Sequence, residues 1–325
     1  MINNITLDEN IEMLSYEEAI NLAKQEVERA LIKSPHLIRD YLKHLASSQG
    51  KYIRAVSVIV AAMDDEGKVH PDAAKAAGAI EIIHLASLVH DDIIDNADLR
   101  RGKLTLQKKY GKRTAVICGD YLLSLALKMI SATADKKRYA QLDLPDYISR
   151  LCLGELEQHL NNYNLNLSIY QYLKIISGKT AALFEASFFA GAMVLNVSEE
   201  QLRKYRQIGY YIGMIFQLTD DCIDFDTTKE VANKPVQSDY EQGVITLPLI
   251  HAFKNLNPFK QKASDEQVTR DEINQAVIKT GGLDFTKGLI KKYYNKAYKR
   301  LDELIITDEK KEKILLILNK ASRMN

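Results

Sequence analysis

Apolar residues recur along most of this chain at helical spacing, in long segments that proline rarely interrupts. No proline lies between Pro145 and Pro235, so this stretch is free to form long helices. Beside Gly178 the pattern is interrupted by Lys179-Thr180, which predicts a kink that turns a cation and a hydroxyl inward. The predicted helical segments include residues 16–33, 56–63, 71–88, 114–130 and 170–194.

Alternation typical of strands, with glycine-containing hairpin turns, is nearly absent. The pattern therefore predicts an all-α protein of about a dozen helices. We expect a single domain over residues 1–325, with disorder confined to the ends, such as residues 1–15. The polar segment Asn255–Asp271 is interpreted as a surface connection between helices.

Composition narrows the functional classes. A net charge of +1 over 325 residues gives no indication of a nucleic-acid-binding surface or a basic membrane patch. Hydrophobic residues make up 46% of the chain, which is enough for a sizeable core. Cys118, Cys152 and Cys222 are scattered without metal-ligand spacing, which favours a reduced, cytoplasmic setting. The N-terminus has no signal-peptide core and no charge-free run approaches the roughly 20 residues that span a bilayer, so a soluble protein is expected.

Two acidic motifs with the same spacing follow apolar helical segments. The first is Asp91-Asp92-Ile93-Ile94-Asp95 and the second is Asp220-Asp221-Cys222-Ile223-Asp224. Residues four apart share a helix face, so the first and last aspartates of each motif stack and repel one another. A divalent cation relieves this repulsion, and oxygen ligands alone select a hard ion such as Mg²⁺. One such motif could equally be a solvated helix end, but two copies favour metal binding.

Cationic residues gather near a predicted helix start and just beyond the first acidic motif. Lys51 and Arg54 share a face where backbone N–H groups would also suit an oxyanion such as phosphate, although a solvated face is the alternative. Arg100 and Arg101 either balance the charge of the first motif or hold an anion whose other side is metal-bound. His84 lies two turns before that motif on the same face, either as a core histidine or as a ligand.

Two long segments carry a family resemblance. Residues 84–105 read HLASLVHDDIIDNADLRRGKLT, and residues 213–225 read GMIFQLTDDCIDF. Over roughly residues 35–300 the chain resembles the trans-polyprenyl diphosphate synthases of the isoprenoid synthase family. The segments CLGELEQ at 152–158 and GKTAAL at 178–183 are similar to the large catalytic component of bacterial hexaprenyl and heptaprenyl diphosphate synthases. The resemblance implies a single-domain helical bundle around a deep central cavity.

The resemblance also implies a reaction and a set of site residues. Isopentenyl diphosphate would condense with an allylic diphosphate, here farnesyl diphosphate, to an all-trans polyprenyl diphosphate for quinone-type isoprenoid biosynthesis. Mg²⁺ ions, about three of them, would bridge the allylic diphosphate to aspartates that face one another across the cavity. The implied metal ligands are Asp91, Asp95, Asp220 and Asp224, with Asp92 and Asp221 completing the shell. The departing diphosphate would meet Arg100, Lys179, Lys234, Thr180 and Gln217, and isopentenyl diphosphate would meet Lys51, Arg54, His84 and Arg101.

Product length in this family depends on the residues below the first acidic motif. Ala86 and Ser87 are small where short-chain members commonly place bulky aromatic residues. The resemblance therefore implies an open tunnel and a product of about six to eight isoprene units. The tunnel floor is expected on the next helix, at Leu122, Leu125, Ala126 and Met129.

Several positions depart from the family pattern. Residues 49–55 read QGKYIRA where the family usually has G-G-K-R-x-R-P, so Gln49 and Tyr52 are changes, while Asn233 replaces a glycine and Val244 a lysine. These departures bear on the affinity for isopentenyl diphosphate and on independence from a partner. The active unit implied by the resemblance is a homodimer, or a heterodimer with a small subunit.

Other hypotheses stay open at this point. The chain could be a catalytic subunit that is inactive without its small partner subunit. It could also be a carboxylate-bridged di-iron bundle using Glu81-x-x-His84, although such a bundle needs a second E-x-x-H and two more glutamates. A terpene cyclase is disfavoured, because the second motif is rich in aspartate.

Overall fold

The computed structural model describes residues 12–46, 50, 52–131, 144–225 and 238–323. Within these residues the protein is almost entirely helical, which confirms the all-α prediction. The elements are α1 (Tyr16–Ile32), α2 (His36–Ala46), α3 (Ile53–Ala62), α4 (Pro71–Ile94), β1 (Leu99–Arg100), β2 (Lys103–Leu104), α5 (Leu106–Tyr110), α6 (Lys112–Ser131), α8 (Leu144–Leu160), α9 (Ile169–Ile176), η1 (Ser177–Ala181), α10 (Ala182–Val194), α11 (Glu199–Ile223), α12 (Ser238–Glu241), α13 (Leu247–Asn255), α14 (Asn257–Asp265), α15 (Arg270–Thr280), α16 (Gly282–Asp302) and α17 (Asp308–Ser322).

Contacts divide the chain into two compact units. The first unit comprises residues 1–142, 187–202 and 305–314, and the second comprises the remaining residues, 143–186, 203–304 and 315–325. α10, α11 and α17 each contribute residues to both units. The acidic motifs are divided between them, because residues 91–95 lie in the first unit and residues 220–224 in the second. The single domain expected from the sequence stays a prediction.

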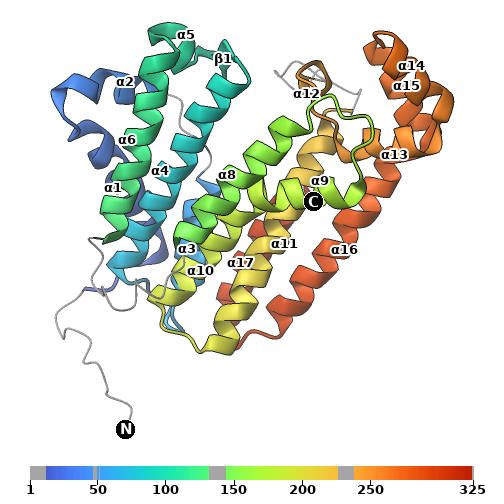
Figure 1. The fold of residues 1–325 in the computed structure, drawn as a ribbon. Coiled ribbons are helices and arrows are strands. Elements are labelled where there is room, and N and C mark those ends of the chain that lie inside the picture. Colours follow the sequence, from blue (N-terminus) through green and yellow to red (C-terminus); the bar gives the residue numbers. More distant parts are fainter. Residues whose placement is uncertain (1–11, 47–49, 51, 132–143, 226–237, 324–325) are drawn as a thin grey trace. The chain divides into compact units, whose positions relative to one another are not determined.

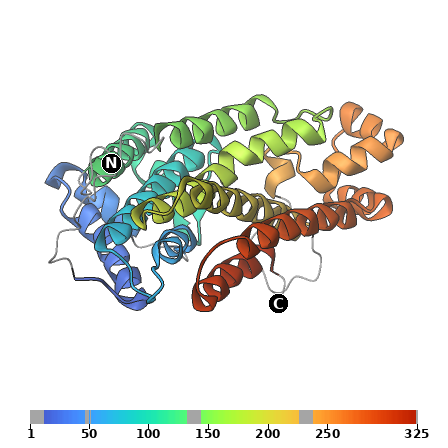
Figure 2. The same ribbon diagram turned by 90° about the horizontal axis from the view of Figure 1, so that it is seen from below.

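α4 is the central helix of the first unit, where it packs against α1, α3 and α6 (Figure 1 and Figure 2). A helix that is apolar on all sides has to be buried on all sides, and most residues of α4 up to Val89 are buried. Its start is well defined, because Pro71 occupies the first turn and the His70 side chain accepts a hydrogen bond from the Asp72 N–H. The first acidic motif therefore stands where a buried helix emerges from the core.

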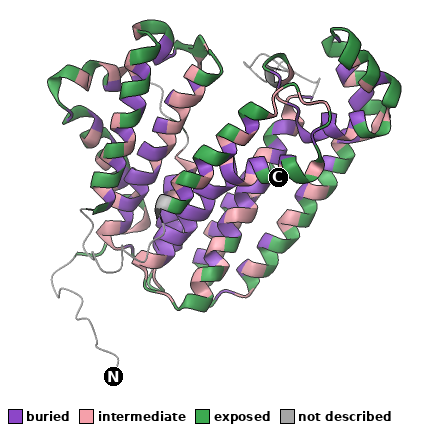
Figure 3. Ribbon diagram, viewed as in Figure 1, coloured by how far each residue is buried: buried purple, intermediate pink, exposed green. Residues whose placement is uncertain are grey.

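The second unit is built around η1 and the helices that contact it, α8 and α9, together with a group formed by α13, α15 and α16. η1 is a π-helix, which confirms the interruption predicted beside Gly178. α16 shows the ordinary amphipathic pattern, with buried and exposed residues alternating along its length (Figure 3).

Two elements were not predicted correctly from the pattern. The segment Asn255–Asp271 was interpreted as a connection, but α14 lies within it, with Pro258 in its first turn. α14 has no apolar stripe, because Phe259 is its only buried residue, and this explains why periodicity missed it. The hairpin of β1 and β2 was also missed, since each strand has two residues, too few to show alternation.

Among the described residues, α6 is the one helix long and apolar enough to cross a membrane by length and composition. A core helix passes the same test. α6 packs along α4, and it carries Asp120 and Lys128 within the apolar stretch. Of this apolar stretch, 28% is buried inside the structure.

Lys310 is a buried cation that joins α17 to the end of α3. Its side chain is 1% exposed, and Nζ donates to the carbonyl oxygens of Ala61 at 2.9 Å and Met63 at 2.6 Å. These carbonyls belong to the end of α3, where a cation is favourable. Burial lowers the pKa of Lys310 to about 7, while Asp65 and Asp64 act in the opposite direction.

We expect the free energy of unfolding to rise with pH between about 7 and 10 because of Lys310. In this window the unfolded chain holds a proton on Lys310 that the folded chain has released, so raising the pH favours folding, on the order of 2 kcal/mol. Urea unfolding at pH 7 and 9.5 measures the change, with Lys310→Met as the control that removes this contribution. An equal pH dependence in both proteins would contradict the assignment.

Candidate active site

The three aspartates of the first motif are in different environments. Asp92 is buried, and its Oδ1 accepts a hydrogen bond from Nε of Arg100 at 2.8 Å. Burial raises the pKa of Asp92, and the guanidinium of Arg100 opposes this effect. Asp91 is partly exposed and Asp95 is exposed. The middle carboxylate is therefore held by the protein, while the two outer carboxylates are accessible.

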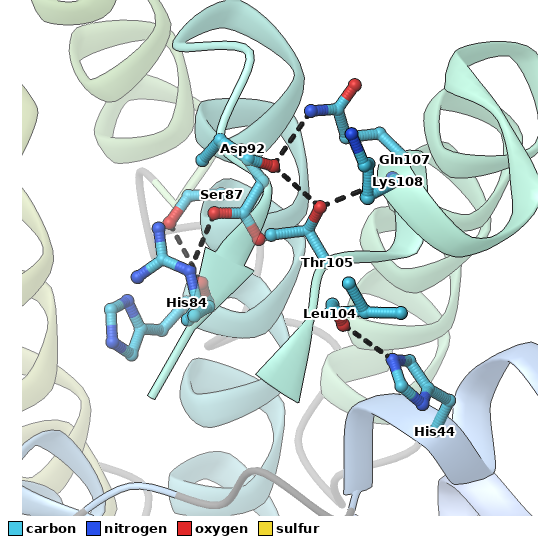
Figure 4. Close-up of polar contacts among 10 residues, drawn as sticks. His44, His84, Ser87, Asp92, Leu104, Thr105, Gln107 and Lys108 are labelled. Atoms are coloured by element: carbon cyan, nitrogen blue, oxygen red, sulfur yellow. Dashed lines mark hydrogen bonds and ion pairs between the residues drawn. The ribbon is translucent and has the colours of Figure 1, made fainter. Parts of the chain in front are cut away.

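The loop after the first motif is held by hydrogen bonds to the carbonyl oxygen of Ala97. The Ala97 N–H donates to the Asp92 carbonyl oxygen at 2.9 Å. The Ala97 carbonyl oxygen accepts from Thr105 Oγ1 at 2.7 Å and from Gln107 Nε2 at 2.8 Å. The side chains of Thr105 and Gln107 are labelled in Figure 4. His44 of α2 donates from Nε2 to the carbonyl oxygen of Leu104 at 2.7 Å. These bonds fix the hairpin against the end of α4, so that Arg100 reaches Asp92.

Arg101 lies in the turn of that hairpin with a φ of 52°, followed by Gly102 with a φ of 76°. A left-handed backbone is unusual for arginine, and glycine, asparagine or aspartate is preferred in such a turn. Its guanidinium lies beside Gly50, because a Cβ added to Gly50 would be 3.2 Å from Arg101. The strained turn thus brings Arg101 to the segment that leads into α3.

The start of α3 is capped by a residue of α4. Tyr52, at the N-cap, has a left-handed backbone and makes no side-chain cap. Glu81 Oε1 instead accepts the Ala55 N–H at 2.9 Å, and the carboxylate also accepts the backbone N–H of Arg54. From the sequence we expect these N–H groups to suit an oxyanion, but in this structure they bind the Glu81 carboxylate.

Two of the cations expected to bind isopentenyl diphosphate, Arg54 and Arg101, lie close enough to His84 to act on its charge. Burial lowers the pKa of His84 well below its ordinary value, and the charges of Arg54, Arg100 and Arg101 lower it further. His84 is therefore neutral at neutral pH, and its backbone carbonyl accepts a hydrogen bond from Ser87 Oγ at 2.9 Å (Figure 4). Two other expected site residues, Lys51 and Lys234, lie outside the described residues.

The second motif repeats the arrangement of the first. Asp221 is 2% exposed and accepts hydrogen bonds from the Tyr172 hydroxyl and from Gln217 Nε2, the latter at 2.9 Å. Gln217 in turn accepts from Thr180 Oγ1 at 2.7 Å. Asp220 is exposed and Asp224 is partly exposed. Again the middle carboxylate is bound within the protein and the outer ones are accessible.

Lys179 is positioned by the close crossing of α8 and η1. A Cβ added to Gly154 would lie 2.3 Å from the Lys179 backbone nitrogen, so only glycine permits this approach. The crossing places Lys179 Nζ 2.8 Å from Oε2 of Glu155. In the sequence, Glu155 stands out only as part of the segment CLGELEQ at 152–158, and Tyr172 is not among the expected site residues. No local signal marks Tyr172, because its partner is 49 positions away.

The donor set suits Mg²⁺ held jointly with a phosphate ligand. Within the described ranges, no group of three or more His, Cys, Asp or Glu side chains could hold a metal ion alone. Mg²⁺ is usually bound through one or two carboxylates, several waters and substrate phosphates, which matches the two outer aspartates of each motif. The di-iron alternative fits less well, because the Glu81 carboxylate caps α3 and faces Arg54 and Arg101.

Comparison with known proteins identifies the family to which this chain belongs. Residues 35–281 match the polyprenyl synthetase family. The chain belongs to that family. It is 34% identical to heptaprenyl diphosphate synthase component 2 of Bacillus subtilis over 88% of this chain and 82% of that protein. It is 27% identical to geranylgeranyl diphosphate synthase of Saccharolobus solfataricus over 94% of this chain and 95% of that protein.

The fold leads to the same family. The crystal structure of heptaprenyl diphosphate synthase from Staphylococcus aureus superposes with a TM-score of 0.86 at 35% identity, covering 96% of this chain and 99% of that one. This polyprenyl synthetase is therefore a prenyltransferase of isoprenoid biosynthesis, as the resemblance implied. Its relatives are named for products from geranylgeranyl to nonaprenyl diphosphate, so likeness alone does not give the product length.

Proposed function

We propose that this chain is the catalytic component of a medium- or long-chain polyprenyl diphosphate synthase. It would extend farnesyl diphosphate with isopentenyl diphosphate, in the presence of Mg²⁺, to an all-trans product of about six to eight units for quinone-type isoprenoids. The observation that carries the proposal is the repeated arrangement of the two acidic motifs, each with its middle aspartate bound and its outer aspartates accessible.

Each group of residues has a role in this reaction. Asp91 and Asp95 of the first motif would hold Mg²⁺, and so would Asp220 and Asp224 of the second; the ion, when bound, stabilises the charge developing on the departing diphosphate. A bound diphosphate would replace Glu155 as the partner of Lys179, because a doubly charged anion attracts the ammonium group more strongly than one carboxylate does.

The residues around His84 would hold the second substrate. Arg54 and Arg101 bind its diphosphate, and neutral His84 adds a hydrogen-bond donor without further charge. Positioned in this way, the isopentenyl double bond lies within reach of the allylic carbon. The allylic C–O bond breaks, the double bond forms the new C–C bond, and the proton that leaves is taken up by the released diphosphate.

One assay tests this proposal. The purified chain is incubated with Mg²⁺, farnesyl diphosphate and labelled isopentenyl diphosphate, with and without EDTA, and the products are separated by chromatography. Elongation that depends on Mg²⁺ is expected. Failure of the chain to elongate either alone or with a second subunit would refute the proposal.

A second candidate is a catalytic subunit that requires a small partner, and the name component 2 of two relatives favours it. The same assay distinguishes it, since elongation would then be absent from the chain alone and present when a second chain is co-purified with it. The active unit would be a heterodimer in this case and a homodimer otherwise.

Replacing Glu81 with glutamine should raise KM for isopentenyl diphosphate about tenfold and leave KM for the allylic substrate unchanged, because α3 loses its charged cap and Arg54 shifts with it. Ser15→Ala, which removes the capping box of α1, is the matched control and should cost about 1 kcal/mol of stability without changing either KM. If Glu81 acted only by repelling the diphosphate, removing its charge would lower KM for isopentenyl diphosphate. A fall in KM would therefore contradict the capping role.

A further inference from the structure

The segment Leu99–Arg113 is strongly basic although the whole chain is nearly neutral. It contains seven arginines and lysines and no carboxylate, whereas the whole chain has 44 basic and 43 acidic residues. The segment forms the hairpin, α5 and the first turn of α6, and it lies at one end of the first unit (Figure 1). We call this segment the basic tip. The net charge of the whole chain does not reveal this local excess of positive charge.

Five cations of the basic tip are exposed and have no part in the proposed substrate site. They are Lys103, Lys108, Lys109, Lys112 and Arg113. The segment itself contributes no carboxylate that would offset this charge. Asp98 pairs with Lys108 at 3.0 Å, Asp120 lies beside His90 at 3.3 Å, and Asp95 belongs to the metal-binding motif. The tip therefore keeps a clear positive excess.

The placement of two of these cations is unfavourable for the helix that carries them. Lys112 and Arg113 occupy the first turn of α6, where no acidic residue is present. The positive end of the helix dipole lies there, so cations oppose it. A local arrangement that costs stability without a packing gain is typical of a binding surface.

Apolar side chains are exposed in the basic tip and just before it. Leu99 and Leu104 are cross-strand neighbours, 61% and 45% exposed, and Ile94 at the end of α4 is 54% exposed. Exposed leucines beside lysines suit the interface of a lipid bilayer, where cations meet headgroup phosphates and apolar groups enter the acyl boundary. A nucleic acid or a free diphosphate would use the cations but not the leucines.

We infer that the basic tip docks this protein on the surface of an anionic bilayer. The reason for docking rests on the proposed function, since a polyprenyl diphosphate with a long apolar tail must pass from the protein into a membrane. Binding itself requires no turnover. It can therefore be measured independently of the elongation reaction.

Vesicle sedimentation tests this inference. The full chain is mixed with vesicles of phosphatidylcholine alone or with phosphatidylglycerol added, at low and high salt. We expect binding to the anionic vesicles only, weakened by salt because exposed charges are screened. Lys103→Gln/Lys112→Gln/Arg113→Gln should lower the partition coefficient about 100-fold, because each cation near an anionic surface contributes about a factor of five.

The matched control removes the same charge elsewhere on the same unit. Lys24→Gln/Lys33→Gln/Lys68→Gln replaces three exposed lysines outside the tip and should bind like the parent protein. Equal binding by the two triple variants would overturn the inference, as would absence of binding to anionic vesicles by the parent. The double variant Leu99→Ser/Leu104→Ser should also bind the anionic vesicles more weakly. If it binds them as the parent protein does, the leucines do not insert into the bilayer. The triple variant of the tip should still elongate the substrate in solution. This result would show that its weaker binding to vesicles does not come from loss of enzyme activity.

Discussion

Replacing Asp91 or Asp220 with alanine should abolish measurable elongation, a loss of about 10³-fold or more, while the thermal midpoint stays the same or rises. Both side chains are accessible and each lies four positions from another aspartate, so without metal the two outer aspartates of each motif repel one another. Initial rates at saturating Mg²⁺ and thermal unfolding without Mg²⁺ provide the two measurements.

The neighbouring aspartates supply the controls for this result. Asp98→Ala removes an exposed carboxylate that pairs with the exposed Lys108, so activity close to that of the parent is expected. Asp92→Ala and Asp221→Ala should lower stability as well as activity, because Arg100, Tyr172 and Gln217 would lose their buried partner. Near-normal turnover by the Asp91 or Asp220 variant would remove the metal assignment.

The chemistry of the site could be predicted where it depends on local spacing. Aspartates four apart at the end of an apolar helix indicate repulsion that needs a cation, whatever the rest of the chain does. The kink at η1 could likewise be predicted, because Gly178 and Lys179 interrupt a helical run. The family resemblance supplied the expected substrate roles that spacing left open, and these roles stay predictions.

What the sequence could not predict are contacts between helices. Glu81 appeared only as half of a possible metal motif, and its capping role depends on α3 lying against α4. Tyr172 and Glu155 acquire meaning only when α9 and α8 place them beside Asp221 and Lys179. Net charge gives no information on local clustering, because a sum over the chain cannot show that seven cations share one short segment.

The structure distinguishes the two residues expected to set product length. Ala86 is fully buried, whereas Ser87 is partly exposed. Ser87 lies four positions before Asp91, so the two share a face of α4, and its hydroxyl is bound back to the carbonyl of His84. A growing chain that starts at Asp91 and extends along that face would therefore pass Ser87 and not Ala86.

Ser87→Phe should consequently shorten the product, because a phenyl ring one turn below Asp91 occupies the path of the growing chain, while the rate of the first condensation stays close to that of the parent. Ala86→Phe is the matched variant, with the same ring at a buried position, and overpacking there should cost about 1–3 kcal/mol of stability. Chromatography of the products and thermal unfolding separate the two effects. If Ala86→Phe shortens the product and Ser87→Phe does not, the tunnel follows another face of α4, since ring size is the same in both variants and only the direction of the side chain differs.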